Sequence, residues 1–135
     1  MSPRQLAFFR LAVRASVAVS LVAALVLTYA GGAGPSVEPG MAAIVTLVLL
    51  AIGVSHYFTL RFVVLPGMLR QPGTPADGLR IIADSFSAAP GVYGLAASIA
   101  TGQGLIVLPF AAVSAALFYV LGSHVEEEIA RRGNA

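Results

Sequence analysis

The sequence has no cysteine, no tryptophan and no lysine, and it has few charged residues of any kind. Without cysteine the chain can form no disulfide, no thiolate metal site and no iron–sulfur cluster, and it has no cysteine nucleophile. Only 10% of the 135 residues are charged, whereas a soluble domain has about a quarter. So few charges cannot cover a surface that faces water, and this argues against an ordinary soluble domain.

Motifs for chemistry are also missing. The sequence contains no GxSxG, no HExxH and no glycine loop of the kind that binds phosphate. We therefore predict a protein that is not an enzyme and that holds no metal and no cofactor. His56 and His124 are the only histidines, and their different predicted depths make bis-histidine haem ligation a minor alternative. A net charge of +2 spread over the whole chain does not favour nucleic acid binding.

Apolar residues make up 58% of the chain and fall in long runs. A membrane-spanning helix needs roughly 20 mostly apolar residues. Four runs approach this length, at 11–30, 41–65, 81–101 and 105–122. We therefore predict an all-α membrane protein, a single domain over 1–135 with four transmembrane helices. The residues between the last two runs, Gly102, Gln103 and Gly104, are so few that these helices must form a tight antiparallel hairpin.

The arginines indicate the orientation. All eight fall on one side of a four-span arrangement: Arg4, Arg10, Arg14, Arg61, Arg70, Arg80, Arg131 and Arg132. Because cytoplasmic loops collect arginine, we expect both termini and the 66–80 loop in the cytoplasm. We expect a bacterial inner membrane, from the high alanine, glycine and arginine content without lysine. A cleaved signal peptide is the alternative for the N-terminus, but the charged region extending to Arg14 is long for one.

A capping pattern and two prolines predict where the third helix begins and where the third and fourth helices bend. Thr74, Pro75 and Asp77 have the spacing of a capping box with proline at the first helical position, which predicts that the third helix begins near Pro75. Pro90 and Pro109 lie inside the third and fourth runs, where proline is expected to kink a helix.

Small residues recur every four positions in two of the predicted spans. Helices in lipid associate by close packing, which small side chains permit. The candidate packing residues are Ala12, Ser16, Ser20, Ala24 and Thr28 in the first span, with Ser87, Gly91, Gly94, Ser98 and Gly102 in the third. They can pack helices within one bundle or between copies of the chain, and the sequence leaves both alternatives open.

Four ionisable residues are expected in the cytoplasmic half of the membrane, three of them at one depth. Counting about 1.5 Å per residue from the outer boundary places Arg14, His56 and Asp84 in this layer, with Arg61 nearer the headgroups. One interpretation is a belt in which Asp84 pairs with Arg14 or Arg61 while His56 is hydrogen-bonded nearby. The alternatives are an ion or proton path through Asp84 and His56, and a pocket for a lipid headgroup or a quinone.

Two tripeptides resemble a known family. Arg70-Gln71-Pro72 in the expected cytoplasmic loop, followed by Tyr93-Gly94-Leu95 in the third span, is similar to the proteolipid subunit of the ATP synthase rotor ring. In that family an ion-binding carboxylate comes five residues before the tyrosine, and that position here is Ala88. The resemblance covers about a quarter of the chain. It implies a close-packed helical hairpin that builds rings or sheets of helices, without the proton-carrying residue.

Taken together, these patterns predict a small non-enzymatic membrane subunit. We expect it to contact membrane lipids and to pack against copies of itself or other membrane subunits. A proton or ion translocator that uses Asp84 and His56 is the main alternative, and a membrane enzyme or lipid-modifying protein is a further one.

Overall fold

The computed structural model describes residues 1–30 and 37–133. These residues are almost entirely helical, which confirms the prediction of an all-α chain. The elements in order are α1 (Pro3–Tyr29), α2 (Pro39–Thr59), the π-helical turn η1 (Leu60–Val64), α3 (Leu65–Leu69), α4 (Ala76–Thr101), the 3₁₀ turn η2 (Gly104–Ile106) and α5 (Val107–Gly133).

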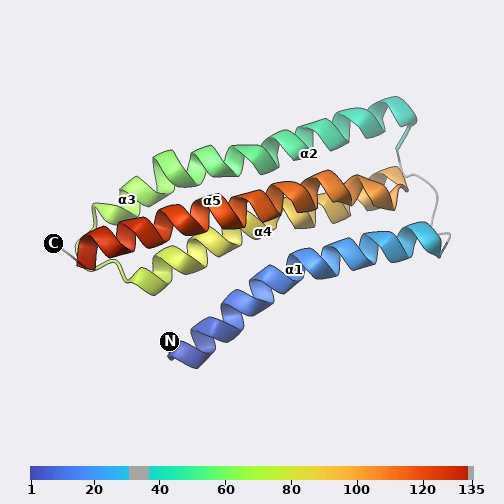
Figure 1. The fold of residues 1–135 in the computed structure, drawn as a ribbon. Helices are drawn as coiled ribbons and strands as arrows, with labels where there is room; N and C mark the ends of the chain where they lie inside the picture. The colour runs from blue at the N-terminus through green and yellow to red at the C-terminus, as the bar shows by residue number, and fades with distance from the viewer. Residues whose placement is uncertain (31–36, 134–135) are drawn as a thin grey trace.

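The helices run alternately in opposite directions along the molecule (Figure 1). The N-terminus, the connection from α3 to α4 and the end of α5 lie at one end, called here the terminal end. The end of α1, the start of α2 and turn η2 lie at the other. Segments α2, η1 and α3 follow one another as a single rod. Residues 1–30 and 37–133 thus form four long antiparallel helical segments.

Helix α4 occupies the centre of this arrangement, because it packs against α1, α2 and α5. Its buried residues include Asp84, Ser87, Gly91 and Ser98. Side chains that face neighbouring helices need not be large and apolar as lipid-facing ones must. This explains why the run at 81–101 has more small and polar residues than the other three.

Three helical segments are long and apolar enough to cross a membrane: Pro3–Tyr29, Pro39–Leu69 and Gly104–Gly133. Among the described residues, α4 does not meet the same measure of hydropathy. Several apolar helices of this length indicate a membrane protein.

The helix ends show where local sequence signals succeed and fail. Ser2 and Gln5 form a reciprocal capping box at the start of α1. The box predicted at Thr74 is wrong, because α4 begins at Ala76 and the Thr74 hydroxyl instead donates to the carbonyl of Met68, 2.7 Å away. Pro109 lies in the first turn of α5, where proline is tolerated, so the kink expected there has no physical basis.

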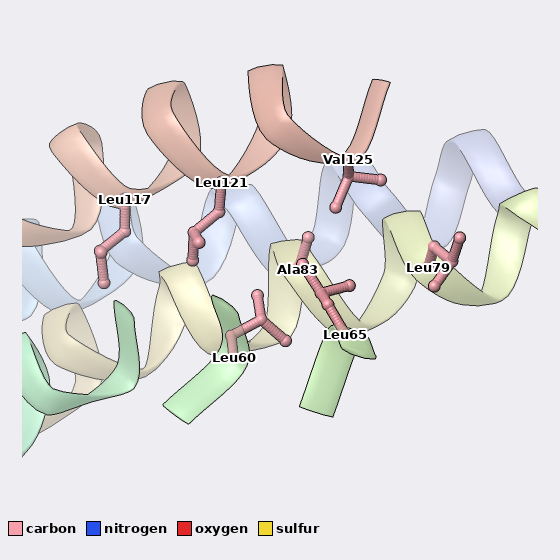
Figure 2. Packing of buried hydrophobic residues seen from close by; sticks show 7 residues of the cluster. All are labelled: Leu60, Leu65, Leu79, Ala83, Leu117, Leu121 and Val125. Carbon is pink, nitrogen blue, oxygen red and sulfur yellow. The ribbon is translucent and has the colours of Figure 1, made fainter. Parts of the chain in front are cut away.

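A cluster of buried apolar side chains joins α4, α5 and the η1–α3 segment toward the terminal end (Figure 2). Its members are Leu60, Leu65, Leu79, Ala83, Leu117, Leu121 and Val125. Turn η1 brings two of them onto one face. Pro66 has no N–H to continue regular α-helical bonding, and the N–H of Leu65 donates to the carbonyl of Leu60, five residues back. Leu65 is thereby placed above Leu60, and both enter the core.

Candidate functional site

The candidate site is centred on Asp84, in the first half of α4. The carboxylate accepts a hydrogen bond from Arg10 Nε to Oδ2 at 2.6 Å and another from Arg14 Nη2 to Oδ1 at 3.3 Å. Only 3% of the Asp84 side chain is exposed. Arg10 and Arg14 are four residues apart on α1, so they project from the same face of that helix. Together the three residues form an ion-paired triad between α1 and α4.

Burial determines what the triad does for the fold. A carboxylate removed from water is strongly unfavourable unless it is paired and hydrogen-bonded. Asp84 has both oxygens engaged by guanidinium groups. The carboxylate is accordingly satisfied only when α1 lies against α4 at this register.

Arg14 occupies a second environment as well. About half of its side chain is exposed, and its guanidinium carbon lies 5.6 Å from the centre of the Phe118 ring on α5. A cation over an aromatic face is attracted by the ring quadrupole. Arg14 thus links α1, α4 and α5 at one level of the bundle.

His56 is held elsewhere, at the contact between α2 and α4. Its Nδ1 lies 2.7 Å from the Ile52 carbonyl and its Nε2 lies 3.1 Å from the Tyr93 hydroxyl. With Nδ1 carrying the proton, Nε2 accepts from Tyr93, as in a neutral imidazole. The ring also packs against Phe86, with centroids 5.4 Å apart. His56 therefore joins α2 to α4 through Tyr93 and is not a member of the triad.

Arg61 also lies apart from Asp84. Its Nη1 donates to the hydroxyl of Tyr57 at 2.6 Å. Its guanidinium group lies over the rings of Tyr57 and Phe62, at 5.7 and 5.9 Å from their centres. Of the four residues expected in one polar layer, the structure brings Arg14 and Asp84 together, whereas His56 and Arg61 have separate partners.

Two ionic contacts between different helices were not anticipated from the sequence. The first is Arg10 as the closer partner of Asp84. The second joins α4 to α5 near the terminal end, where Arg80 makes two hydrogen bonds to Glu126, at 2.7 and 2.8 Å. The hydrogen bond from Arg80 lowers the pKa of Glu126 below its usual value, and the same contact raises the pKa of Arg80. The i,i+4 spacing of Arg10 and Arg14 was the available signal for the first contact.

The small residues of α1 partly face the bundle interior. Ser20 and Ala24 are buried, whereas Ala12 is exposed. Added to Gly104 of η2, a Cβ would meet the Thr28 hydroxyl and the Ala24 carbonyl. The hydroxyls of Ser16 and Thr28 donate to carbonyls of their own helix.

The small residues of α4 permit close approach on several sides. A Cβ on Gly91 would lie 2.9 Å from Val17 Cγ1 on α1, and one on Gly94 would lie 2.6 Å from Phe110 Cβ on α5. Ser87 and Ser98 are buried, and their hydroxyls donate to carbonyls within α4. Gly102 ends α4 with a positive φ of 68°, a conformation that glycine adopts at little cost.

A buried polar contact accompanies the proline inside α4. The N–H of Gly91, directly after Pro90, donates to the Ser114 hydroxyl of α5 at 2.8 Å. Proline disturbs regular backbone bonding, and a neighbouring serine can satisfy the freed group. Ser114 is fully buried, so this hydrogen bond fixes the register of α4 against α5.

The arrangement is that of a packed helical bundle with an ion-paired triad between α1 and α4. Within 1–30 and 37–133, no three histidine or acidic side chains gather as ligands for a metal ion. No family model matches the chain, and comparisons with curated proteins and with solved structures find no significant similarity. The resemblance of 70–95 to the rotor-ring proteolipid stays a prediction.

Proposed function

We propose that the chain is a small, non-enzymatic integral membrane subunit that packs against further transmembrane helices, supplied by copies of itself or by other membrane proteins. In this proposal all four long helical segments cross the membrane as two antiparallel hairpins. Helix α4 is included because α1, α2 and α5 surround it, so that it exposes little surface to lipid.

The orientation follows from charge. All eight arginines lie in the half of the bundle nearer the terminal end. Arginine is retained on the cytoplasmic side of membranes. We therefore assign both termini and the connection between α3 and α4 to the cytoplasm.

The exposed face of α2 is the main support for assembly. Of the three candidate spanning segments, the one containing α2 buries the smallest share of its residues. Ala51, Ser55 and Thr59 recur every four residues on α2, and all three are exposed. The Ser55 hydroxyl donates to the Ile52 carbonyl, so its polarity is satisfied within α2. Small residues at this spacing let a second helix approach closely.

Native mass spectrometry of the gently extracted particle tests this function. We expect a defined multiple of the 13.8 kDa chain, or a complex with other membrane proteins. Replacing Ala51 and Ser55 together by leucine should reduce the assembled fraction at least tenfold, since bulky side chains keep the helices apart. Ala112→Leu, on an exposed position of α5, is the matched control and should assemble normally. A lone monomer under all mild conditions would overturn the proposal.

Proton or ion translocation is a second candidate, because Asp84 is a buried ionisable residue within a helix of membrane length. The geometry supports it less well, since Asp84 is engaged by two arginines and His56 by Tyr93. Proton flux into proteoliposomes should be the same for the wild type and for the Asp84→Ala, His56→Ala double variant. A loss of flux in the variant would instead make translocation the leading function.

A further inference from the structure

A groove with a volume of about 570 Å³ lies between α1 and α5. Its apolar walls are formed by Val17, Ala18, Leu21, Ala111, Ala115 and Phe118. Arg14 and Tyr119 lie at the same end of it, since Arg14 comes first among the lining residues of α1 and Tyr119 comes last among those of the antiparallel α5. The groove is thus amphipathic, with a cationic end and an apolar length.

The charge of Arg14 is only partly compensated by the protein. Arg14 shares the carboxylate of Asp84 with Arg10, which makes the shorter contact, 2.6 Å against 3.3 Å. A guanidinium group has five N–H donors, and 51% of the Arg14 side chain is exposed. A charged group at membrane depth is costly unless it meets a counter-charge or water. The exposed part of Arg14 therefore favours an anion at this end of the groove.

The depth of Arg14 indicates where that anion comes from. Arg14 lies fifteen residues before Tyr29, which ends α1, and this corresponds to roughly 22 Å of helix. With Tyr29 at one boundary of a hydrocarbon core about 30 Å thick, Arg14 lies about 8 Å inside the other boundary. An arginine side chain can extend from this depth toward the headgroups. Tyr119, 77% exposed, has the amphipathic ring that is common at this level.

We propose that the groove binds one anionic phospholipid from the leaflet at the terminal end. Its phosphate accepts hydrogen bonds from Arg14. One acyl chain lies along the apolar walls toward the middle of the membrane. The apolar length of the groove favours an amphiphile over a free anion. The partly compensated charge of Arg14 favours an anionic lipid over a zwitterionic one, whose own cation balances its phosphate.

Lipid binding to the delipidated protein in detergent tests the site. Native mass spectrometry would compare phosphatidylglycerol with phosphatidylcholine of the same acyl chains, counting adducts on the single-chain mass peak. We expect about tenfold tighter binding of phosphatidylglycerol, because no headgroup cation balances the charge of its phosphate beside Arg14. Arg14→Gln should reduce phosphatidylglycerol binding to the phosphatidylcholine level, whereas Arg70→Gln, in the exposed connection before α4, should not.

A second pair of variants tests the groove without changing a charged residue. Ala115→Leu fills the apolar part and should weaken the binding of both lipids severalfold. Ala116→Leu adds the same volume at an exposed position that does not line the groove, and it should bind as the wild type does. This pair keeps the test valid even where Arg14→Gln lowers the stability of the fold.

The site would be overturned by equal binding of the two lipids by the wild type or by unchanged selectivity in Arg14→Gln. Displacement of the lipid by millimolar inorganic phosphate would overturn it too, since this would indicate a free-anion site. Loss of a dimer peak in Arg14→Gln, without change on the single-chain peak, would assign the groove to a second copy and would also overturn it. Because adducts are counted on single chains, failure of the lipid site is separable from failure of assembly.

Discussion

The carboxylate of Asp84 joins α4 to α1 through its ion pairs with Arg10 and Arg14. It has little access to solvent, and its two partners come from adjacent turns of α1. Replacing a buried ion pair by apolar residues can be neutral, but removing one partner leaves the other charge uncompensated. The stability of the bundle should therefore be more sensitive to this carboxylate than to those near the helix ends.

Asp84→Asn should lower the free energy of unfolding by about 3–5 kcal/mol, since Arg10 and Arg14 lose their shared counter-charge. Thermal unfolding followed by circular dichroism in detergent would measure the change. The matched control is Asp77→Asn, because Asp77 contacts Arg80 at 3.4 Å but is about half exposed, and its loss should cost less than about 1 kcal/mol. Equal effects of the two substitutions would contradict a structural role for the triad.

The residue scale also shows what a sequence can predict about a site. Counting along a helix gives a depth, and by depth Arg14, His56 and Asp84 belong together, with Arg61 nearer the headgroups. Depth contains no information about direction around the helix axis. His56 faces Tyr93, and Arg61 lies over Tyr57 on the rod formed by α2, η1 and α3. The direction depends on helix packing, which one sequence does not specify.

Among the helices, α4 depends most on side chains that are absent or small. Gly91 lies against Val17 of α1, Gly94 lies against Phe110 of α5, and a Cβ on Gly53 of α2 would lie 3.1 Å from Pro90 Cβ. Each glycine lets a different partner helix approach α4. This is how one helix of modest hydropathy contacts three others.

Gly94→Ala should destabilise the protein by about 1–3 kcal/mol, because the new methyl group would lie 2.6 Å from Phe110 Cβ and force α4 and α5 apart. Gly122→Ala is the matched control: it is a helical glycine of α5, and beyond the adjoining backbone of its own helix no atom lies within 4 Å of the added Cβ. There the change should be neutral or stabilising by up to about 1 kcal/mol. Unfolding in a denaturing detergent gives both values, and a harmless Gly94→Ala would refute close contact at this point.

The Arg80–Glu126 pair predicts a pH dependence between α4 and α5. Because the pKa of Glu126 is lowered in the folded protein, the pair stabilises the fold at neutral pH. That contribution is lost as the pH falls below the usual carboxyl range and through the lowered pKa. Both side chains are partly exposed, so the effect should be less than about 1 kcal/mol.

Unfolding measured from pH 7 to pH 3 would test this pair. The stability of the wild type should fall more over this range than that of Glu126→Gln, because the variant lacks the carboxylate that is protonated. Glu127→Gln, exposed on the next position of α5, should lose stability at low pH as the wild type does. Parallel pH profiles for the wild type and Glu126→Gln would show that the pair contributes nothing.

The architecture of the whole molecule was largely predictable. Long apolar runs determine the helices, and the connection at 102–104 is too short for anything except a hairpin. The central place of α4 was not predictable, because a weakly apolar run is equally compatible with a peripheral helix. What reveals it is the set of neighbours on three sides, which no pattern within the run encodes.

The absence of cysteine makes the orientation directly measurable. Single cysteines at Ser2, Gln71 and Gln103 introduce the only thiols in the protein. With both termini in the cytoplasm, a maleimide that cannot cross membranes should label Gln103→Cys in intact cells. Ser2→Cys and Gln71→Cys should react only after the cells are opened. Labelling of Gln71→Cys from outside would reverse the orientation, and labelling of Gln71→Cys and Gln103→Cys from the same side would remove α4 as a span.

Turn η1 has a consequence for how the chain tolerates a change of length. Leu60 and Leu65 share a core-facing side although they are five positions apart, whereas an ordinary α-helix aligns residues three or four apart. The segment thus holds one residue more than regular helical spacing needs. Deleting one residue between 61 and 64 would leave the two leucines four positions apart, and ordinary helical spacing would still bring both to the core. The same deletion inside α4, between Asp84 and Gly94, would instead rotate the two halves of α4 by about 100° relative to each other, so that Asp84 and Gly94 could not both keep their partners.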